Sequence, residues 1–318
     1  MKEFCIGIDI GGTNTVLGVV DTNGNFSAEN SISTKKYKKI DDFIEALNIC
    51  IQESLDSIET DFVLKGIGVG APNGNYYNGT IEYAPNLNWN EIIPLSNILS
   101  KKFNVPVVLT NDANAAALGE MIYGAAKDLK DFIVITLGTG LGSGLVVNGE
   151  VIYGHDGFAG EIGHTIYDPN GRMCACGRKG CLETYASATG IKRTVIELLN
   201  NSETKSLLNE IPENELNSKD IYEAAVKGDK LALEAFDYTA RILGLKLADS
   251  IAYTSPEAIF LFGGLALAGD YILKPTKKYM EENLLKIYKN KVRLELSGLM
   301  GKNAAVLGAA ALIWKEFD

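Results

Sequence analysis

The chain has 318 residues, of which 46% are hydrophobic and 22% are charged, and its formal net charge is −10. This length and composition predict a globular protein with a large core and two domains. The acidic balance lacks the electrostatic footprint of a nucleic-acid binder. Because the sequence has neither an apolar run of eighteen residues nor a signal peptide, we expect a cytoplasmic protein that does not enter a membrane.

The first half of the chain alternates short apolar runs with turns. An apolar run at 4–10 meets Gly11-Gly12-Thr13 and resumes at 15–20, which predicts a strand, a tight turn and a second strand. A helical spacing and two further strands follow, at 40–58, 65–69 and 105–109. The last of these strands leads into Asn111-Asp112 and an alanine-rich helix.

The opening pattern then returns. An apolar run at 131–137 precedes the turn at 138–144, the apolar pattern resumes at 145–147, and Asn148-Gly149 signals a hairpin. We interpret the two copies as an internal duplication of architecture.

The second half continues with a cysteine-rich irregular segment that extends to residue 183 and a largely helical stretch to about residue 253. A buried strand at 258–262 ends in Gly263-Gly264, and a helix at 304–314 closes the chain. We expect an N-terminal α/β lobe at 1–111, joined by a C-terminal helix at 303–318, and a larger α/β lobe at 112–302.

The two glycine turns suggest a phosphate site. Backbone amides without a neighbouring Cβ can approach a phosphate, and Thr13 and Thr139 add hydroxyl donors. Asp9 would repel a phosphate unless Mg²⁺ lay between them. Two such turns predict two lobes that clamp one polyphosphate, although glycine-rich hairpins are also common without a ligand. Gly263-Gly264 is either a backbone shelf beside an adenosine or the turn that opens a helix.

Asp112 follows a predicted strand and opens a helix. In one interpretation Asn111 or Asp112 simply caps that helix. In the other, Asp112 is a general base that accepts a proton from a sugar hydroxyl during phosphoryl transfer. The spacing alone leaves both interpretations open.

A cluster of cysteine and histidine predicts a metal site. His164 precedes Cys174, Cys176 and Cys181, so four of the seven cysteines and histidines fall within eighteen residues. Three thiolates and one imidazole form the closed tetrahedral set of a structural Zn²⁺. The alternative is three reduced cysteines packed in a loop. With all four positions filled, the zinc would fold the loop rather than take part in the chemistry.

Three motifs together resemble the ROK family, named for repressors, open reading frames and sugar kinases. They are Asp9-Ile10-Gly11-Gly12-Thr13, the Glu-x-Gly-His motif at 161–164 and the Cys-x-Cys-Gly-x-x-Gly-Cys-x-Glu motif at 174–183. The resemblance spans nearly the whole chain. It implies the actin-like, hexokinase-like ATPase fold, with two ribonuclease-H-like α/β lobes and an interlobe cleft.

The resemblance also implies an ATP-dependent kinase that phosphorylates the 6-hydroxyl of a free hexose, with Mg²⁺, a structural Zn²⁺ and a homodimeric assembly. Asp112 is then the catalytic base. The implied sugar-binding set is Asn86, Asn111, Asp112, Glu161, His164 and Glu183. The implied zinc ligands are His164, Cys174, Cys176 and Cys181. The expected nucleotide site consists of Asp9, Gly11, Gly12, Thr13, Gly138, Thr139, Gly140, Gly263 and Gly264.

The sequence departs from the family pattern at two places. Asn14 stands where the family often has lysine after Gly-Gly-Thr, and Pro72-Asn73-Gly74 stands where it often has Pro-Gly. Neither departure removes a catalytic group, but both bear on sugar or nucleotide preference.

Several functions compete. Glucose is the leading substrate, and N-acetylmannosamine, fructose, mannose and allose are alternatives because the Glu161, His164 and Glu183 set serves acetamido sugars as well. A sugar-responsive repressor would carry a DNA-binding segment ahead of Asp9, which lies eight residues from the start. A non-DNA-binding sugar sensor is the third hypothesis.

Overall fold

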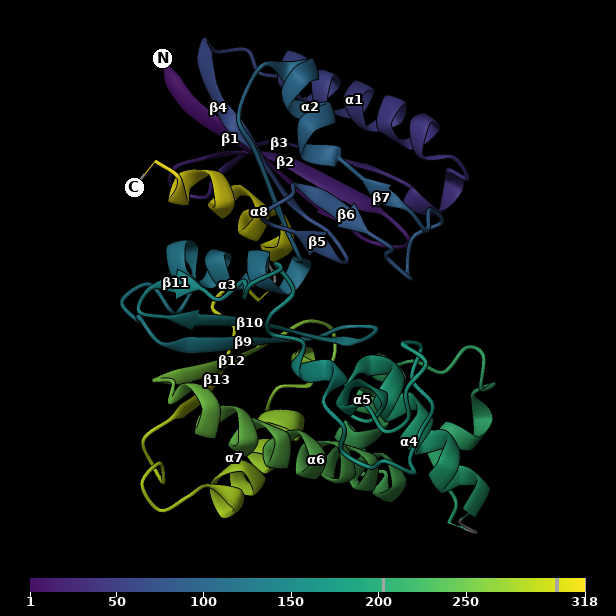
Figure 1. Ribbon diagram of the computed structural model, residues 1–318. Coiled ribbons are helices and arrows are strands. Elements are labelled where there is room, and N and C mark those ends of the chain that lie inside the picture. The colour runs from purple at the N-terminus through teal and green to yellow at the C-terminus, as the bar shows by residue number, and fades with distance from the viewer. Residues whose placement is uncertain (202–203, 301–302, 318) are drawn as a thin grey trace. The chain divides into compact units, whose positions relative to one another are not determined.

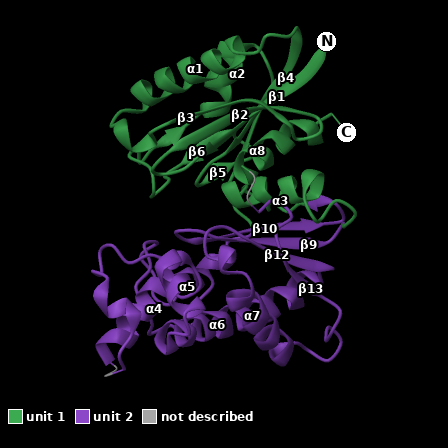
Figure 2. Ribbon diagram, turned by 180° about the vertical axis from the view of Figure 1, so that it is seen from behind, with its two compact units in different colours: residues 1–129, 151–159, 301–318 green, residues 130–150, 160–300 purple. Residues whose placement is uncertain are grey.

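The computed structural model describes residues 1–201, 204–300 and 303–317. The chain divides into two units (Figure 2). Unit 1 comprises residues 1–129, 151–159 and the C-terminal segment from residue 301, and unit 2 comprises residues 130–150 and 160–300. These units are defined by their compactness and do not test the expected lobes. The lobes at 1–111 and 112–302 therefore stay a prediction.

A five-stranded sheet forms the centre of unit 1, in the order β3-β2-β1-β4-β8 (Figure 1). The strands β1, β2 and β3 are antiparallel neighbours, whereas β4 and β8 run parallel to β1. These strands are β1 Lys2–Ile10, β2 Thr15–Asp21, β3 Phe26–Ile32, β4 Phe62–Gly70 and β8 Val107–Thr110. A smaller sheet contains β5 Gly74–Asn75, β6 Thr80–Glu82 and β7 Ile92–Ile93. The helices are α1 Ile40–Asp56, α2 Leu95–Phe103, α3 Asp112–Tyr123 and α8 Ala304–Lys315, with a 3₁₀ helix η1 at Thr34–Lys36.

Unit 2 contains a second sheet with an equivalent strand order, β11-β10-β9-β12-β13. Its strands are β9 Phe132–Leu137, β10 Leu141–Val147, β11 Glu150–Val151 at the unit's boundary, β12 Ala258–Phe262 and β13 Arg293–Leu296. Its helices are α4 Ala188–Asn201, α5 Ser218–Val226, α6 Lys230–Thr254 and α7 Asp270–Asn283. Its 3₁₀ helices are η2 Ile162–His164, η3 Leu182–Thr184, η4 Leu207–Glu210 and η5 Ala266–Ala268. The shared order confirms the predicted duplication and the α/β fold class.

Burial follows the position of each strand. The central strand β1 is buried without interruption from Phe4 to Ile8, which explains its unbroken apolar run. The outer strand β3 alternates between half-buried and exposed residues, as a strand with one covered face does. The large side chains of Phe4, Phe43 and Trp89 belong to the core of unit 1.

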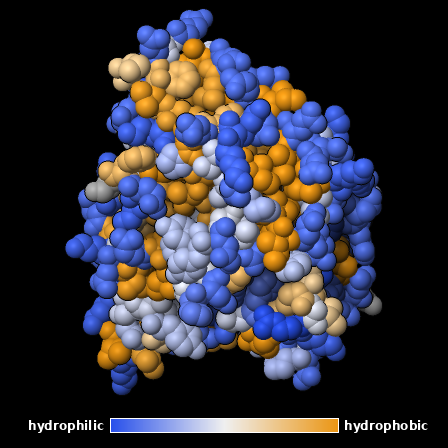
Figure 3. Space-filling model, turned by 45° about the horizontal axis from the view of Figure 1, so that its top comes forward, coloured by the Kyte–Doolittle hydropathy of each residue, from blue (hydrophilic) through white to orange (hydrophobic). Residues whose placement is uncertain are grey.

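The surface mixes hydrophilic and hydrophobic side chains, as the face in Figure 3 shows. Exposed apolar residues such as Tyr253 and Ile287 are ordinary on globular proteins. Among the described residues, the helices are all too short or too polar to cross a membrane.

Helix α8 returns to the N-terminal sheet, where glycines let it pack closely. A Cβ added at Gly68 of β4 would lie 1.8 Å from the Ala309 carbonyl oxygen, and one at Gly7 of β1 would lie 2.1 Å from that of Val306. On the other side of the helix, Gly308 lies against the Ala115 backbone of α3. The expected helix at 303–318 thus begins and ends slightly inside its predicted bounds, and residue 318 lies outside the described residues.

We expect Gly68→Ala to destabilise unit 1, because the added methyl would collide with backbone that cannot move independently. The free energy of unfolding should fall by about 1–3 kcal/mol or more, measured by urea denaturation. Gly264→Ala is the matched control, since a Cβ there would meet no atom within 4 Å. Equal stability of the two variants would contradict the close packing of α8.

Candidate functional site

In unit 1 the candidate residues lie where parallel strands end. Asp9 pairs with Gly70 between β1 and β4, and Gly70 pairs with Thr110 between β4 and β8. Asn111 and Asp112 follow Thr110 directly. Because parallel strands end at one edge of a sheet, residues about one hundred positions apart in the sequence are brought to the same edge.

Asn111, not Asp112, caps helix α3. The Asn111 side-chain oxygen accepts a hydrogen bond of 2.7 Å from the Asn114 amide. The exposed Asp112 accepts a hydrogen bond of 2.9 Å from the next amide, that of Ala113. The first interpretation of this motif is therefore right for Asn111, and the Asp112 carboxylate is not required as the helix cap.

The pKa values of both carboxylates at this edge are raised. Desolvation, together with the negative charge of Asp112, raises the pKa of Asp9 to about 7. Desolvation also raises the pKa of Asp112, while the amides of Ala113 and of Asp112 itself act in the opposite direction. Perturbed carboxylates of this kind gather at functional sites more often than elsewhere.

The first glycine turn lies in the same unit. The Gly11 amide donates to the Asn14 carbonyl oxygen over 3.0 Å, which closes the turn. A Cβ at Gly12 would lie 2.5 Å from the Asn86 carbonyl oxygen, so Asn86 lies directly against the turn. Thr13 is exposed, and its carbonyl accepts a hydrogen bond of 3.2 Å from the Lys35 amide.

The second glycine turn and the Gly263-Gly264 segment share an edge of the sheet in unit 2. Strand β12 runs parallel to β9, with Phe262 opposite Thr136, and the Leu265 amide donates to the Leu137 carbonyl over 3.0 Å. A Cβ at Gly138 or Gly264 would meet no atom within 4 Å. This edge therefore combines backbone amides with open space.

The predicted metal ligands converge in unit 2. One donor atom from each of His164, Cys174, Cys176 and Cys181 lies within 4.8 Å of all the others. The Cys176 and Cys181 sulfurs are 3.6 Å apart, and the Cys174 sulfur is 3.8 Å from His164 Nδ1. Tetrahedral ligands at about 2.3 Å from a zinc ion would lie about 3.8 Å apart, so the donor set fits such an ion.

Arg178 supports this cluster and was not singled out from the sequence. Desolvation raises the pKa of the Cys176 thiol, but hydrogen bonds from the backbone and side chain of Arg178 outweigh this effect and lower the pKa to about 6. The guanidinium also donates to the His164 carbonyl over 2.9 Å. Its position between the second and third cysteines is the signal that could have identified it.

Glu183 connects the metal cluster with the second glycine turn. One carboxylate oxygen lies 2.9 Å from the Cys174 sulfur and 3.7 Å from His164 Nδ1. The other accepts a hydrogen bond of 3.4 Å from the Leu141 amide, and a Cβ at Gly140 would lie 2.6 Å from it. Glu161 lies on the same segment, as the exposed residue that precedes η2.

The structure therefore groups the candidate residues into one set in each unit. Unit 1 holds Asp9, the first glycine turn, Asn86, Asn111 and Asp112. Unit 2 holds the second glycine turn, Gly263-Gly264, Glu161, Glu183 and the Cys–His cluster.

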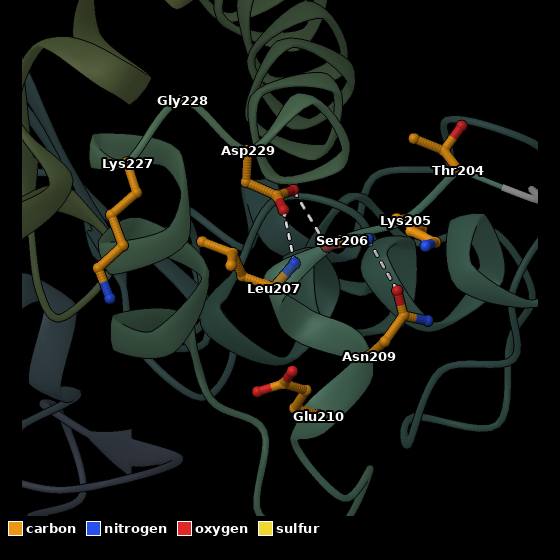
Figure 4. A pocket seen from close by; sticks show the side chains of 9 residues that line it. All are labelled: Thr204, Lys205, Ser206, Leu207, Asn209, Glu210, Lys227, Gly228 and Asp229. Carbon is orange, nitrogen blue, oxygen red and sulfur yellow. Dashed lines mark hydrogen bonds between the residues drawn. The ribbon is translucent and has the colours of Figure 1, made fainter.

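A cavity of about 660 Å³ in unit 2 lies apart from these residues (Figure 4). The Asp229 carboxylate at its wall accepts hydrogen bonds from the Ser206 hydroxyl and from the Leu207 and Ala232 amides. These bonds join η4 to the start of α6, so we assign Asp229 a structural role.

Comparison with known proteins finds likeness over the whole chain. The sequence model described as ROK family matches residues 5–316. The glucokinase of Halalkalibacterium halodurans is 36% identical over 324 residues, which cover 99% of this chain and 96% of that enzyme. A ROK family glucokinase from Streptomyces griseus, solved with glucose and AMPPNP, is 32% identical with a TM-score of 0.83, over 98% of this chain and 99% of that one. A ROK family transcriptional regulator, a homolog of the E. coli MLC protein, is 28% identical with a TM-score of 0.88, over 99% of this chain and 78% of its own.

The raised pKa of Asp9 predicts a pH-dependent cost of folding. Between about pH 4 and pH 7 the folded chain retains a proton on Asp9 that the unfolded chain releases, so stability falls as the pH rises through this window. We expect Asp9→Asn to be more stable than the wild type at pH 8, by on the order of 1–4 kcal/mol. At pH 5.5 this gain in stability should be smaller.

Urea denaturation at both pH values measures this difference. The exposed Asp61→Asn is the control and should leave the pH dependence unchanged. An Asp9→Asn gain of equal size at pH 5.5 and pH 8 would contradict the raised pKa.

Proposed function

Because the chain belongs to the ROK family, we propose that it is an ATP-dependent kinase that phosphorylates the 6-hydroxyl of a free hexose, with glucose preferred. One observation carries the chemistry: Asn111 caps α3, so the Asp112 carboxylate is not needed as the cap and is available to a substrate. The similar Streptomyces griseus enzyme was solved with glucose and AMPPNP, which supports the choice of both substrates.

Asp112 is the proposed general base. Its carboxylate would accept the proton of the sugar 6-hydroxyl as that oxygen attacks the terminal phosphate of ATP. Desolvation raises its pKa toward the working pH, which makes it a better proton acceptor while it remains ionised. The Ala113 amide fixes the orientation of the carboxylate.

The remaining candidate residues would bind the substrates. The glycine turns offer amides to the phosphates, and Gly138 and Gly264 leave room for them because a Cβ there would meet no atom. Asp9 fits a Mg²⁺ ligand, since its carboxylate lies beside the negative charge of Asp112 and a cation would relieve that repulsion. When bound, Mg²⁺ would offset the negative charge of the phosphates.

Polar side chains would hold the sugar. Asn111 uses its side-chain oxygen as a cap and keeps its amide group as a donor, and His164 has Nδ1 at the metal cluster and keeps Nε2. The proposed sugar ligands are Asn86, Asn111, Asp112, Glu161, His164 and Glu183. We also propose that His164, Cys174, Cys176 and Cys181 hold a structural Zn²⁺, that the protein is a homodimer and that it is cytoplasmic.

The test is ADP release from Mg-ATP with a panel of free hexoses. Glucose should give the highest kcat/KM, and Asp112→Asn should lower kcat about 10²–10⁴-fold, the usual contribution of general base catalysis, with little change in sugar affinity. The exposed Asp128→Asn is the control and should retain turnover. Near-wild-type kcat in Asp112→Asn would exclude Asp112 as the general base. A higher kcat/KM for N-acetylmannosamine than for glucose would overturn glucose as the preferred substrate.

Removal of the metal should loosen the segment that carries the sugar ligands. We expect about one zinc per chain in the purified protein, and its loss in Cys176→Ser, with a lower melting temperature and a raised KM for the sugar. Elemental analysis and calorimetry measure these changes. Cys50→Ala, outside the cluster, should keep its zinc, and a wild-type protein free of zinc after expression in zinc-supplemented medium would refute the site.

A further inference from the structure

Two hydroxyl groups connect the segment of Glu183 to the second glycine turn. The Ser187 hydroxyl donates to the Glu183 carbonyl oxygen over 2.6 Å. The Thr189 hydroxyl donates to the Thr139 carbonyl oxygen over 2.7 Å. The two hydroxyl oxygens are 3.1 Å apart, so a continuous chain of contacts extends from Glu183 to Thr139 within unit 2.

The same segment contacts the turn at two further positions. The Ala188 amide donates to the Gly138 carbonyl over 2.9 Å, and the Leu141 amide donates to the Glu183 carboxylate over 3.4 Å. Three hydrogen bonds therefore hold the backbone of the turn against residues 183–189. A shift of this segment would change the direction of the amides that the turn offers to a phosphate.

The number of hydroxyl hydrogens on Ser187 and Thr189 limits how many of their contacts can be hydrogen bonds. Two hydroxyl hydrogens serve three contacts, and both are used when the carbonyls of Glu183 and Thr139 are satisfied. The contact between the hydroxyl oxygens is then one of packing. Ser187 is fully buried and also accepts a hydrogen bond from the Gly190 amide, so it has little freedom, whereas Thr189 is exposed.

We propose that Ser187 and Thr189 are positioning residues that couple sugar binding at Glu183 to nucleotide binding at the second glycine turn. This inference rests on the proposed function and adds to it a coupling of the two substrates. A sugar bound to Glu183 would fix its backbone and, through the two hydroxyls, the Thr139 carbonyl. The nucleotide would then lose less conformational entropy when it binds the turn.

The experiment measures coupling directly. Calorimetry gives the Kd of AMPPNP with and without saturating glucose, and the Kd of glucose with and without AMPPNP. In the wild type each ligand should tighten the other by the same factor, because coupling is reciprocal. Thr189→Val keeps the shape and removes the hydroxyl, so the factor should fall about two- to tenfold, the range of one hydrogen bond, while the Kd of glucose alone is unchanged.

Two matched variants separate positioning from folding. Thr189→Ser keeps a hydroxyl and should restore the coupling. Thr254→Val removes a hydroxyl that bonds to the Ser250 carbonyl within α6 and should leave the coupling factor unchanged. Melting temperature and zinc content of each variant report on folding. An unchanged factor in Thr189→Val, or no coupling in a wild type that still phosphorylates glucose, would overturn this inference alone, whereas absence of turnover with every hexose would overturn the proposed function as well.

Discussion

The parallel pairing of β1, β4 and β8 is the constraint on which the candidate site depends. It brings Asp9 and Asp112 to one edge of the sheet, although the helices α1 and α2 and several strands separate them in the sequence. Helix α8 packs against the same sheet at Gly7 and Gly68, where any larger residue would collide with the helix backbone. Helix packing and the placement of the carboxylates are therefore parts of one arrangement.

This arrangement lowers the stability of the folded chain as Asp9 ionises, and the proposed function explains why it is kept. Desolvation, together with the negative charge of Asp112, raises the pKa of Asp9 to about 7, so that its ionisation costs free energy in the folded chain. A fold selected for stability alone would place an amide or an apolar side chain there. In the proposed kinase, the same two carboxylates would hold a divalent cation and accept a proton, and the ends of the strands would fix their positions.

The sequence predicted the elements with strong local signals and missed those that depend on tertiary contacts. The duplicated strands, the glycine turns and the Cys–His cluster were predictable because turn residues and ligand types are local. The division of roles between Asn111 and Asp112 was left open, since either side chain caps a helix equally well. Ser187 and Thr189 escaped notice because they donate to carbonyl oxygens, which every residue offers. Arg178 escaped notice because its contacts with Cys176 and the His164 carbonyl depend on how the loop folds.

The proposed sugar ligands of unit 2 lie in a segment with little regular structure, and side-chain contacts link this segment to the rest of the unit. Apart from η2 and η3, residues 160–184 form only isolated bridges among the described residues. Arg172 joins this segment to α4 by hydrogen bonds to the Thr194 hydroxyl and the Glu197 carboxylate, and its guanidinium lies 4.6 Å from the Tyr185 ring. The Cys–His cluster would fix the other end. Since each link is specific, the segment can be irregular in shape and still hold Glu183 in one place, which is what recognition of a small polar sugar requires.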